Sequence, residues 1–270
     1  MLVREFQRIV DAVLPPESAM HGDAIGLQVA SKRSDVGRVL VCLEITDAIV
    51  AEAIERSCDT ILTFHPLIYT PLARLDRSDR VSRCVGDLIV ADISVICVHT
   101  TFDAFPQGTN LILAERLGLE PLRPLVPSMD RSTGMGLLAS CSMTYSELIE
   151  RIAVVCGGPV RHCPPLSESV RAVAIVGGSG VSFYDAAVSS GADVFITADV
   201  KYHAFHAASG VIGLVDPGHF EMEQFVPAGL VSVLSTAAPS LTFLESTVVT
   251  NPVHYAYRSS QRSINLSSHP

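Results

Sequence analysis

Three histidines stand directly after apolar runs that have the composition of buried β-strands. His65 follows TILTF, His99 follows SVICV, and His219 follows VIGLVDPG. The second and third are followed four residues later by a carboxylate, Asp103 and Glu223. Imidazole and carboxylate groups bind zinc, iron and manganese, and open α/β sheets place functional groups at the ends of strands. The pattern is typical either of one metal or catalytic site built from three strand ends, or of ordinary core and capping histidines.

Each segment therefore has a structural interpretation beside the chemical one. The ring of His65 could cap a neighbouring carbonyl. Asp103 or the adjacent threonines could start the helix expected after Gln107 or stabilise a turn. A helical path through GHFEMEQF puts His219 and Glu223 on one face and points Glu221 elsewhere. Acids are also favoured at the start of any helix by its dipole. Spacing alone leaves both interpretations open.

Other segments place polar groups beside predicted strand ends. The loop VGGSG, residues 176–180, suits anion binding at a helix start, but it lacks the P-loop lysine, and a tight turn is favoured. Lys201 and His203 could contact a substrate anion or transfer a proton, or form a solvated helix face. Glu44 is either an acid that supports the site or a surface residue.

Composition restricts the class of protein. The chain has 270 residues, 48% hydrophobic, with a net charge of −9 and no Lys/Arg cluster, so a small molecule or a cation is a better partner than nucleic acid or an anionic membrane. Seven cysteines without a C-x-x-C pair predict a reduced, cytoplasmic protein. Charged residues interrupt the first apolar helix, which is unlike a signal peptide, and no apolar stretch reaches the ~20 residues of a membrane span.

Strands and helices alternate along the chain, which predicts an α/β fold with largely parallel strands. A first amphipathic helix should end at Pro15 and Pro16. Three prolines at residues 120–130 predict the linker between two domains. The first domain then covers residues 1–122, joined by a C-terminal segment at 240–270, and the second covers residues 123–239.

Taken in order, these segments resemble the Nif-three-like family of dinuclear-metal-centre proteins, often labelled GTP-cyclohydrolase-like. The resemblance runs from about residue 2 to residue 253. It is carried by AIGLQV, LVCLEIT, FHPLIY, HTTFDA with TNLILAERLGL, VGGSG, GADVFITADVKYH, GHFEME and NPV. It implies two linked α/β domains with mixed or mostly parallel sheets, a metal site in the cleft between them, and a ring-shaped homohexamer without the insert domain of some relatives.

The resemblance also implies roles for particular residues. His65 and Asp103 would bind one divalent cation, His219 would bind the other, and Glu223 would bridge both. His99 would lie beside the site as a ligand or an acid–base group. The expected cation is zinc, iron or manganese, with one or two ions per subunit.

One departure from the family pattern bears on the number of ions. The family has a histidine pair before Pro-Leu-Ile, but this chain has Phe64 and His65, and phenylalanine cannot coordinate a metal. An asymmetric centre, with a single ion or a weak second one, is therefore expected. Two smaller departures are Ala24 after Asp23, where asparagine is usual, and Glu44, where aspartate is usual.

These observations together predict a metal-dependent hydrolase. A metal-activated water would attack a C–N bond of a small heterocycle or cyclic amide, with His99 or His203 moving protons. The alternatives are a non-catalytic metal-binding or metal-delivery protein and a degenerate homologue kept as a scaffold. The sequence does not specify the substrate, the metal, or the role of the tail after residue 253.

Overall fold

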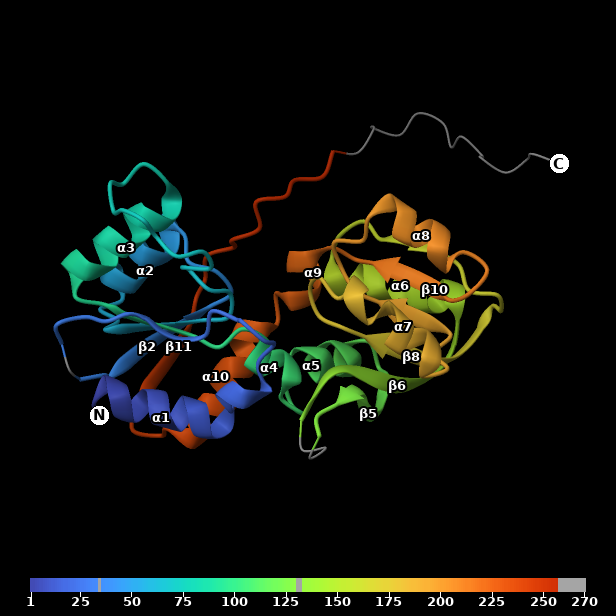
Figure 1. Cartoon of the computed structure of the whole chain (residues 1–270), viewed down its shortest axis with the longest axis horizontal. Helices are drawn as coiled ribbons and strands as arrows, with labels where there is room; N and C mark the ends of the chain where they lie inside the picture. Colours follow the sequence, from blue (N-terminus) through green and yellow to red (C-terminus); the bar gives the residue numbers. More distant parts are fainter. Residues whose placement is uncertain (34, 130–132, 257–270) are drawn as a thin grey trace.

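The computed structural model describes residues 1–33, 35–129 and 133–256, and it has two lobes, each built on one β-sheet (Figure 1). The first sheet has the strand order β1-β4-β3-β2-β11, and the second has the order β5-β6-β8-β9-β10-β7. The strands are β1 (Gly26–Val29), β2 (Arg38–Cys42), β3 (Thr60–Thr63), β4 (Ser94–Cys97), β5 (Glu120–Pro127), β6 (Gly134–Thr144), β7 (Arg161–Cys163), β8 (Ser169–Ile175), β9 (Val194–Ile196), β10 (Gly213–Asp216) and β11 (Thr242–Glu245). The predicted α/β fold is confirmed.

Helices cover both faces of each sheet (Figure 1). The α-helices are α1 (Val3–Val13), α2 (Asp47–Glu55), α3 (Arg80–Ala91), α4 (Thr100–Ala104), α5 (Thr109–Arg116), α6 (Tyr145–Cys156), α7 (Tyr184–Ser189), α8 (Tyr202–Ala208), α9 (His219–Glu223) and α10 (Val226–Ala237). Short 3-10 turns lie at η1 (Pro16–Ser18) and η2 (Val181–Phe183).

Alternate residues of β2 enter different cores. Val39 and Val41 pack with α1 and α10 on one face of the first sheet, and Leu40 and Cys42 pack with α2 and α3 on the other face. The sheet is parallel except for β1, which runs antiparallel to β4. Burial on both faces explains why its parallel strands are continuous apolar runs in the sequence.

The second sheet is mixed. The strands β8, β9 and β10 are parallel, whereas β5, β6 and β7 join antiparallel. One face packs against α5 and α6, and the other packs against α7 and α8. The chain returns from this sheet to the first through α10 and β11, which pairs in parallel with β2. The proposed division at residues 122 and 239 stays a prediction, and α10 packs with the first sheet.

The predicted linker at residues 120–130 is wrong for most of its length. Residues 120–127 form the strand β5, which pairs along β6. Pro121, Pro124 and Pro127 are tolerated because β5 is the edge of its sheet, where a missing N–H costs no bond to a further strand. A run of prolines can therefore mark an edge strand as well as a linker.

The arrangement of parallel strands decides where the functional groups meet. His65 and His99 follow the carboxyl ends of β3 and β4 in the first sheet. Asp199 and His219 follow the carboxyl ends of β9 and β10 in the second. The helices α4, α5 and α9 lie between the two lobes (Figure 1), so the candidate site forms where the two sets of strand ends face each other. Among the described residues, each helix is too short or too polar to cross a membrane.

Candidate metal centre

His65 is fixed by the end of its strand. The main chain continues the β2–β3 pairing for two residues beyond β3, and the N–H of His65 donates to the carbonyl of Leu43 at 2.8 Å. Pro66 then ends the strand because it has no N–H to donate. The imidazole therefore leaves a rigid sheet edge and points into the cleft.

His219 and Glu223 lie on the single turn of α9. Their spacing of four residues puts both side chains on one face, as the sequence predicted. The turn begins at Gly218, whose φ is +98°, and a Cβ there would lie 2.2 Å from Oε2 of Glu221. Only glycine fits this position, so the helix can start directly after β10.

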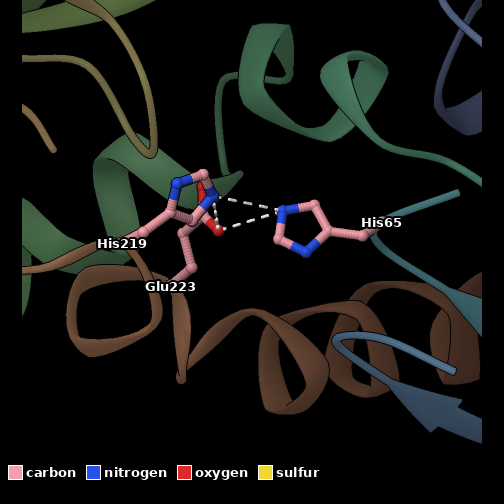
Figure 2. Close-up of side chains that lie close together, drawn as sticks. All are labelled: His65, His219 and Glu223. Atoms are coloured by element: carbon pink, nitrogen blue, oxygen red, sulfur yellow. Dashed lines mark hydrogen bonds and ion pairs between the residues drawn. The ribbon is translucent and has the colours of Figure 1, made fainter. Parts of the chain in front are cut away.

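The three side chains converge on one point (Figure 2). Nε2 of His65 lies 3.2 Å from Oε2 of Glu223, and Nε2 of His219 lies 3.0 Å from the same oxygen. The two Nε2 atoms are 3.4 Å apart. All three ligand atoms lie within 4.8 Å of one another, which makes this group able to hold a metal ion. The set of two imidazoles and one carboxylate is found in catalytic zinc sites and in non-haem iron sites.

One buried oxygen of the triad supports this assignment, and a second lies near it. Oε2 of Glu223 lies at ion-pairing distance from both imidazoles, yet neither contact has the geometry of a hydrogen bond. Oδ1 of Asp103 is buried without a hydrogen-bond partner among the described residues. A cation between the two imidazoles would bind Oε2 of Glu223 directly, whereas Asp103 lies outside the group that could hold it. The residues present therefore fit a divalent ion.

The protein without metal holds protons at this point instead. Burial lowers the pKa of His65, but contacts with Glu223 and Glu44 outweigh burial and raise it to about 9. Burial likewise opposes the effect of Glu223 and Asp199 on His219, whose pKa rises to about 10. Burial raises the pKa of Glu223, but the two imidazoles lower it to about 2. A divalent ion would take the place of these two protons.

Two further carboxylates orient the imidazole rings. Oε1 of Glu44 lies 3.3 Å from Nδ1 of His65, and Oδ2 of Asp199 lies 2.8 Å from Nδ1 of His219. A carboxylate on Nδ1 fixes the tautomer that leaves Nε2 free to bind a metal. Of the two roles left open for Glu44, the structure favours support of the site. Sequence reasoning assigned Asp199 no role, although it lies in the motif GADVFITADVKYH.

We expect Asp199→Asn to weaken metal binding by about tenfold to 100-fold, because an amide does not select the Nδ1–H tautomer of His219 as strongly as a carboxylate does. Dissociation constants from competition with a chelator would measure this. Asp185→Asn, at an exposed position of α7, is the matched control and should bind metal as the wild type does. Equal metal affinities for the two variants would mean that Asp199 does not support metal binding.

The loop after β8 forms a wall of the site. A Cβ on Gly178 would lie 2.4 Å from Oε1 of Glu223 and 3.1 Å from Nε2 of His219, and φ at this glycine is +58°. A Cβ on Gly177 would lie 2.7 Å from Cγ2 of Thr109. The sequence analysis favoured a tight turn here, and the turn brings the main chain against the candidate ligands.

Gly178→Ala should therefore disturb the triad as well as the turn. Gly191 is a matched control, because its φ is +79° but a Cβ there would meet nothing within 4 Å. We expect both alanine variants to lose about 1–2 kcal/mol of stability from the left-handed backbone. Only Gly178→Ala should also lose metal affinity, measured by chelator competition. Loss of metal by both variants would mean that backbone strain alone is responsible.

Asp103 is close to the triad but outside it. It lies on the short helix α4, and burial raises the pKa of its carboxyl to about 7, with a further contribution from the charge of Glu223. The alternative that it caps the following helix is wrong, because Gly108 occupies the N-cap of α5 without a side-chain bond. Its role as a ligand of a first cation stays a prediction.

The two predicted proton-transfer histidines lie in different places. The His99 ring packs against that of His65, with centroids 5.6 Å apart, and its Nδ1 lies 2.6 Å from Oδ1 of Asp23. Hydrogen bonds to His99 and Thr100 lower the pKa of Asp23 to about 2 despite its burial. His203 is exposed on α8 beside Tyr202, and it belongs neither to the triad nor to the lining of the cavity in front of it.

A cavity of about 430 Å³ opens in front of His65 and His219. Its walls include α9 and the extended segment 251–255 that follows β11. Asn251 and the hydroxyl of Tyr255 donate to Oε1 of Glu221 at 2.8 Å and 3.0 Å, which ties this segment to α9. A small molecule of drug-like size fits in such a volume.

Comparisons with known proteins agree with this architecture. The family model described as Duf34/NIF3 (NGG1p interacting factor 3) matches residues 1–252. A Streptococcus pneumoniae relative named GTP cyclohydrolase 1 type 2 homolog is 34% identical over 266 residues, which cover 94% of this chain and 100% of the relative. A Lactococcus lactis relative of the same name is 30% identical over 261 residues, covering 94% of this chain and 99% of the relative.

Solved structures show the same fold. Staphylococcus aureus protein SA1388 superimposes with a TM-score of 0.88 at 26% identity, covering 95% of this chain and 99% of that one. A Bacillus cereus protein related to NIF3 gives a TM-score of 0.88 at 22% identity, with the same coverage. The resemblance drawn from the sequence motifs is confirmed, and the chain belongs to the Duf34/NIF3 family.

Proposed function

We propose that this protein is a metal-dependent hydrolase that cleaves a C–N bond of a small heterocycle or cyclic amide. The observation that carries the proposal is the convergence of His65, His219 and Glu223 on one point beside a ligand-sized cavity. An ion bound there supplies Lewis-acid polarisation and activates water for hydrolysis. Three protein ligands are the usual number for a catalytic zinc ion, since a further position stays open to water or substrate.

The chain's own groups complete the site. Glu44 and Asp199 hold the rings of His65 and His219 so that both Nε2 atoms face the centre. His99 lies against His65 and is held by Asp23 through Nδ1, which leaves its Nε2 as a group able to move a proton near the site. His203, exposed on α8, would have to reach a substrate from the rim.

Incubation of the metal-loaded protein with a panel of heterocycles, cyclic amides and GTP tests the proposal. We expect ring opening or deamination of at least one compound, lost in His65→Ala and unchanged in a variant of an exposed residue of α2 such as Glu55→Gln. Failure of the loaded protein to turn over any compound would contradict hydrolase activity.

Phe64 is the reason to expect one ion at full occupancy. Its side chain is fully buried in the core of the first lobe, and its ring lies 4.9 Å from the ring of His65. We expect Phe64→His to raise the metal content from one ion per chain toward two, at a cost in stability because a polar ring enters an apolar core. Elemental analysis and thermal melting measure both effects, and an unchanged metal content would contradict a site at this position.

The second candidate function is metal binding and delivery without catalysis. It is favoured by the replacement of a ligand position by Phe64 and by the place of Asp103 outside the triad, since fewer ligands hold an ion less tightly. The rate of metal loss to a chelator separates the two functions: slow loss favours the hydrolase, and rapid loss without turnover favours delivery. A hexameric assembly stays a prediction from the family resemblance, which light scattering would test.

A further inference from the structure

One arginine, Arg161, lines the cavity in front of the triad. The other charged side chains of the cavity wall, apart from the two histidines, are carboxylates: Glu44, Asp199, Asp216 and Glu221. An acidic wall would by itself suit a cation. Whether it repels an anion depends on what each carboxylate already binds.

Each of these carboxylates is engaged by a donor of the protein. Glu44 and Asp199 contact Nδ1 of His65 and of His219. Glu221 accepts hydrogen bonds from Asn251 at 2.8 Å and from the Tyr255 hydroxyl at 3.0 Å. These contacts orient the metal ligands and the wall of the cavity, and they leave the wall acidic.

Asp216 is the carboxylate that holds Arg161. It is buried at the end of β10, and it accepts from the main-chain N–H groups of Val200 and Gly218, each at 3.0 Å. Nη2 of Arg161 donates to Asp216 and, at 2.6 Å, to the carbonyl of Val200. The arginine is thus anchored by a buried group that is itself fixed by the main chain.

Several N–H groups of the anchored Arg161 guanidinium are available to a ligand. Its carbon lies 5.5 Å from the centre of the Phe205 ring, and the side chain is 58% exposed. Within the described part of the chain, Nη1 and Nε donate to no acceptor, while Nη2 makes both bonds. A guanidinium has five N–H donors in a fixed plane, and the free ones match a carboxylate or phosphate oxygen pair.

We propose that Arg161 binds a single anionic group, of the carboxylate class, on the substrate of this site. The inference rests on the proposed function, because it assigns the cavity beside the triad to the substrate. The acidic lining of the cavity limits the substrate to one negative charge. Asp216 already compensates the arginine, and three more carboxylates line the same cavity, so a triphosphate would meet more repulsion than attraction.

Matched pairs of ring compounds that differ by one carboxylate test the proposal: orotate and uracil, dihydroorotate and dihydrouracil, and pyroglutamate and pyrrolidinone. Dissociation constants for the metal-loaded protein are measured by NMR titration. We expect the carboxylated member of at least one pair to bind about tenfold more tightly or better. GTP should bind no more tightly than guanosine. Equal binding within every pair, or tighter binding of GTP than of any carboxylated ring, would overturn the proposal.

A carboxylate can also bind the metal ion directly. Variants of Arg161 therefore distinguish binding by the arginine from binding by the ion. Arg161→Gln should abolish the preference for the carboxylated member of each pair. Arg161→Lys should keep part of this preference, since the charge remains but the planar guanidinium is lost. Arg171→Gln, at an exposed position of β8, should leave it unchanged. Melting temperature and metal content are measured for each variant. A preference that survives in folded Arg161→Gln would place the carboxylate elsewhere and refute the assignment.

These outcomes are distinct from the fate of the hydrolase proposal. A protein that binds carboxylated rings through Arg161 but hydrolyses none of the compounds would refute the proposed reaction and keep this inference. A protein that hydrolyses uncharged and carboxylated rings equally well would keep the reaction and refute the role of Arg161.

Discussion

Glu223→Gln should abolish tight metal binding. The substitution keeps the shape of the side chain but removes the one carboxylate that lies between the two imidazoles, at 3.0 Å and 3.2 Å from their Nε2 atoms. We expect the dissociation constant to rise more than about 100-fold, beyond the effect of losing a group that only orients a ligand. Metal-free Glu223→Gln should also be less stable by about 3 kcal/mol near pH 6, because both imidazolium groups lose a buried partner.

Glu52→Gln is the matched control for this variant. Glu52 is also a buried carboxylate, but it binds Arg56, Ser246 and Thr247 and is not part of the triad or of the cavity wall. It should lose stability without losing metal. Chelator competition and thermal melting measure the two properties separately. If Glu223→Gln bound metal within a few-fold of the wild-type affinity, the triad would not be the metal site.

Metal binding at pH 7 should release about two protons per ion, because both candidate histidine ligands must lose a proton to coordinate. The pKa values of His65 and His219 in the metal-free protein are raised to about 9 and about 10, so both rings are protonated at pH 7. Calorimetric titrations in buffers of different ionisation enthalpy give the number directly. A release of less than half a proton would contradict the charged pair of imidazoles.

The same shifts give the metal-free protein a defined dependence of stability on pH. A histidine with a raised pKa contributes stability that is complete below its unfolded value and is lost as pH rises through the folded value, here from 6.5 to about 10. Glu223, with a lowered pKa, contributes stability above 4.5 that is lost as pH falls toward 2. Asp103, with a raised pKa, subtracts stability as pH rises from 3.8 to about 7.

Together these groups make the metal-free protein less stable at pH 9 than at pH 5. Metal should reverse the trend, because its affinity rises as the histidines lose their protons. Melting temperatures of the metal-free and metal-loaded protein across this range measure the effect. The trend should weaken above pH 7 in a double variant, His65→Ala with His219→Ala, while the part due to Asp103 remains at lower pH. A pH dependence above pH 7 that is unchanged by that variant would assign it to other groups.

The sequence by itself determined the secondary structure of most of the chain and the ends of the strands that carry histidines. Apolar runs such as TILTF and SVICV are local patterns, and the spacing of His219 and Glu223 is a local property of one helical turn. Such features follow from the periodicity of the chain and from the turn residues beside it. The order of the motifs determined the family for the same reason.

The tertiary structure decided which of these groups meet. His65 and His219 are 154 positions apart, and their contact depends on how the two sheets face each other. That arrangement brings in Asp199 and Glu44, and it leaves Asp103 just outside the triad. No local pattern specifies these distances, because they are set by the packing of both cores.

The edge strand β5 and the loop at Gly178 illustrate the same limit. Three prolines look like a linker until the sheet order places them on an edge with no further neighbour. The glycine turn at residues 177–178 looks like an ordinary connection from strand to helix. In the folded chain, a Cβ added at Gly178 would lie 2.4 Å from Oε1 of Glu223, so the turn packs closely against the candidate ligands. Sequence fixes what a segment can form, and only the folded chain decides what that segment touches, since contacts between distant segments depend on every element packed between them.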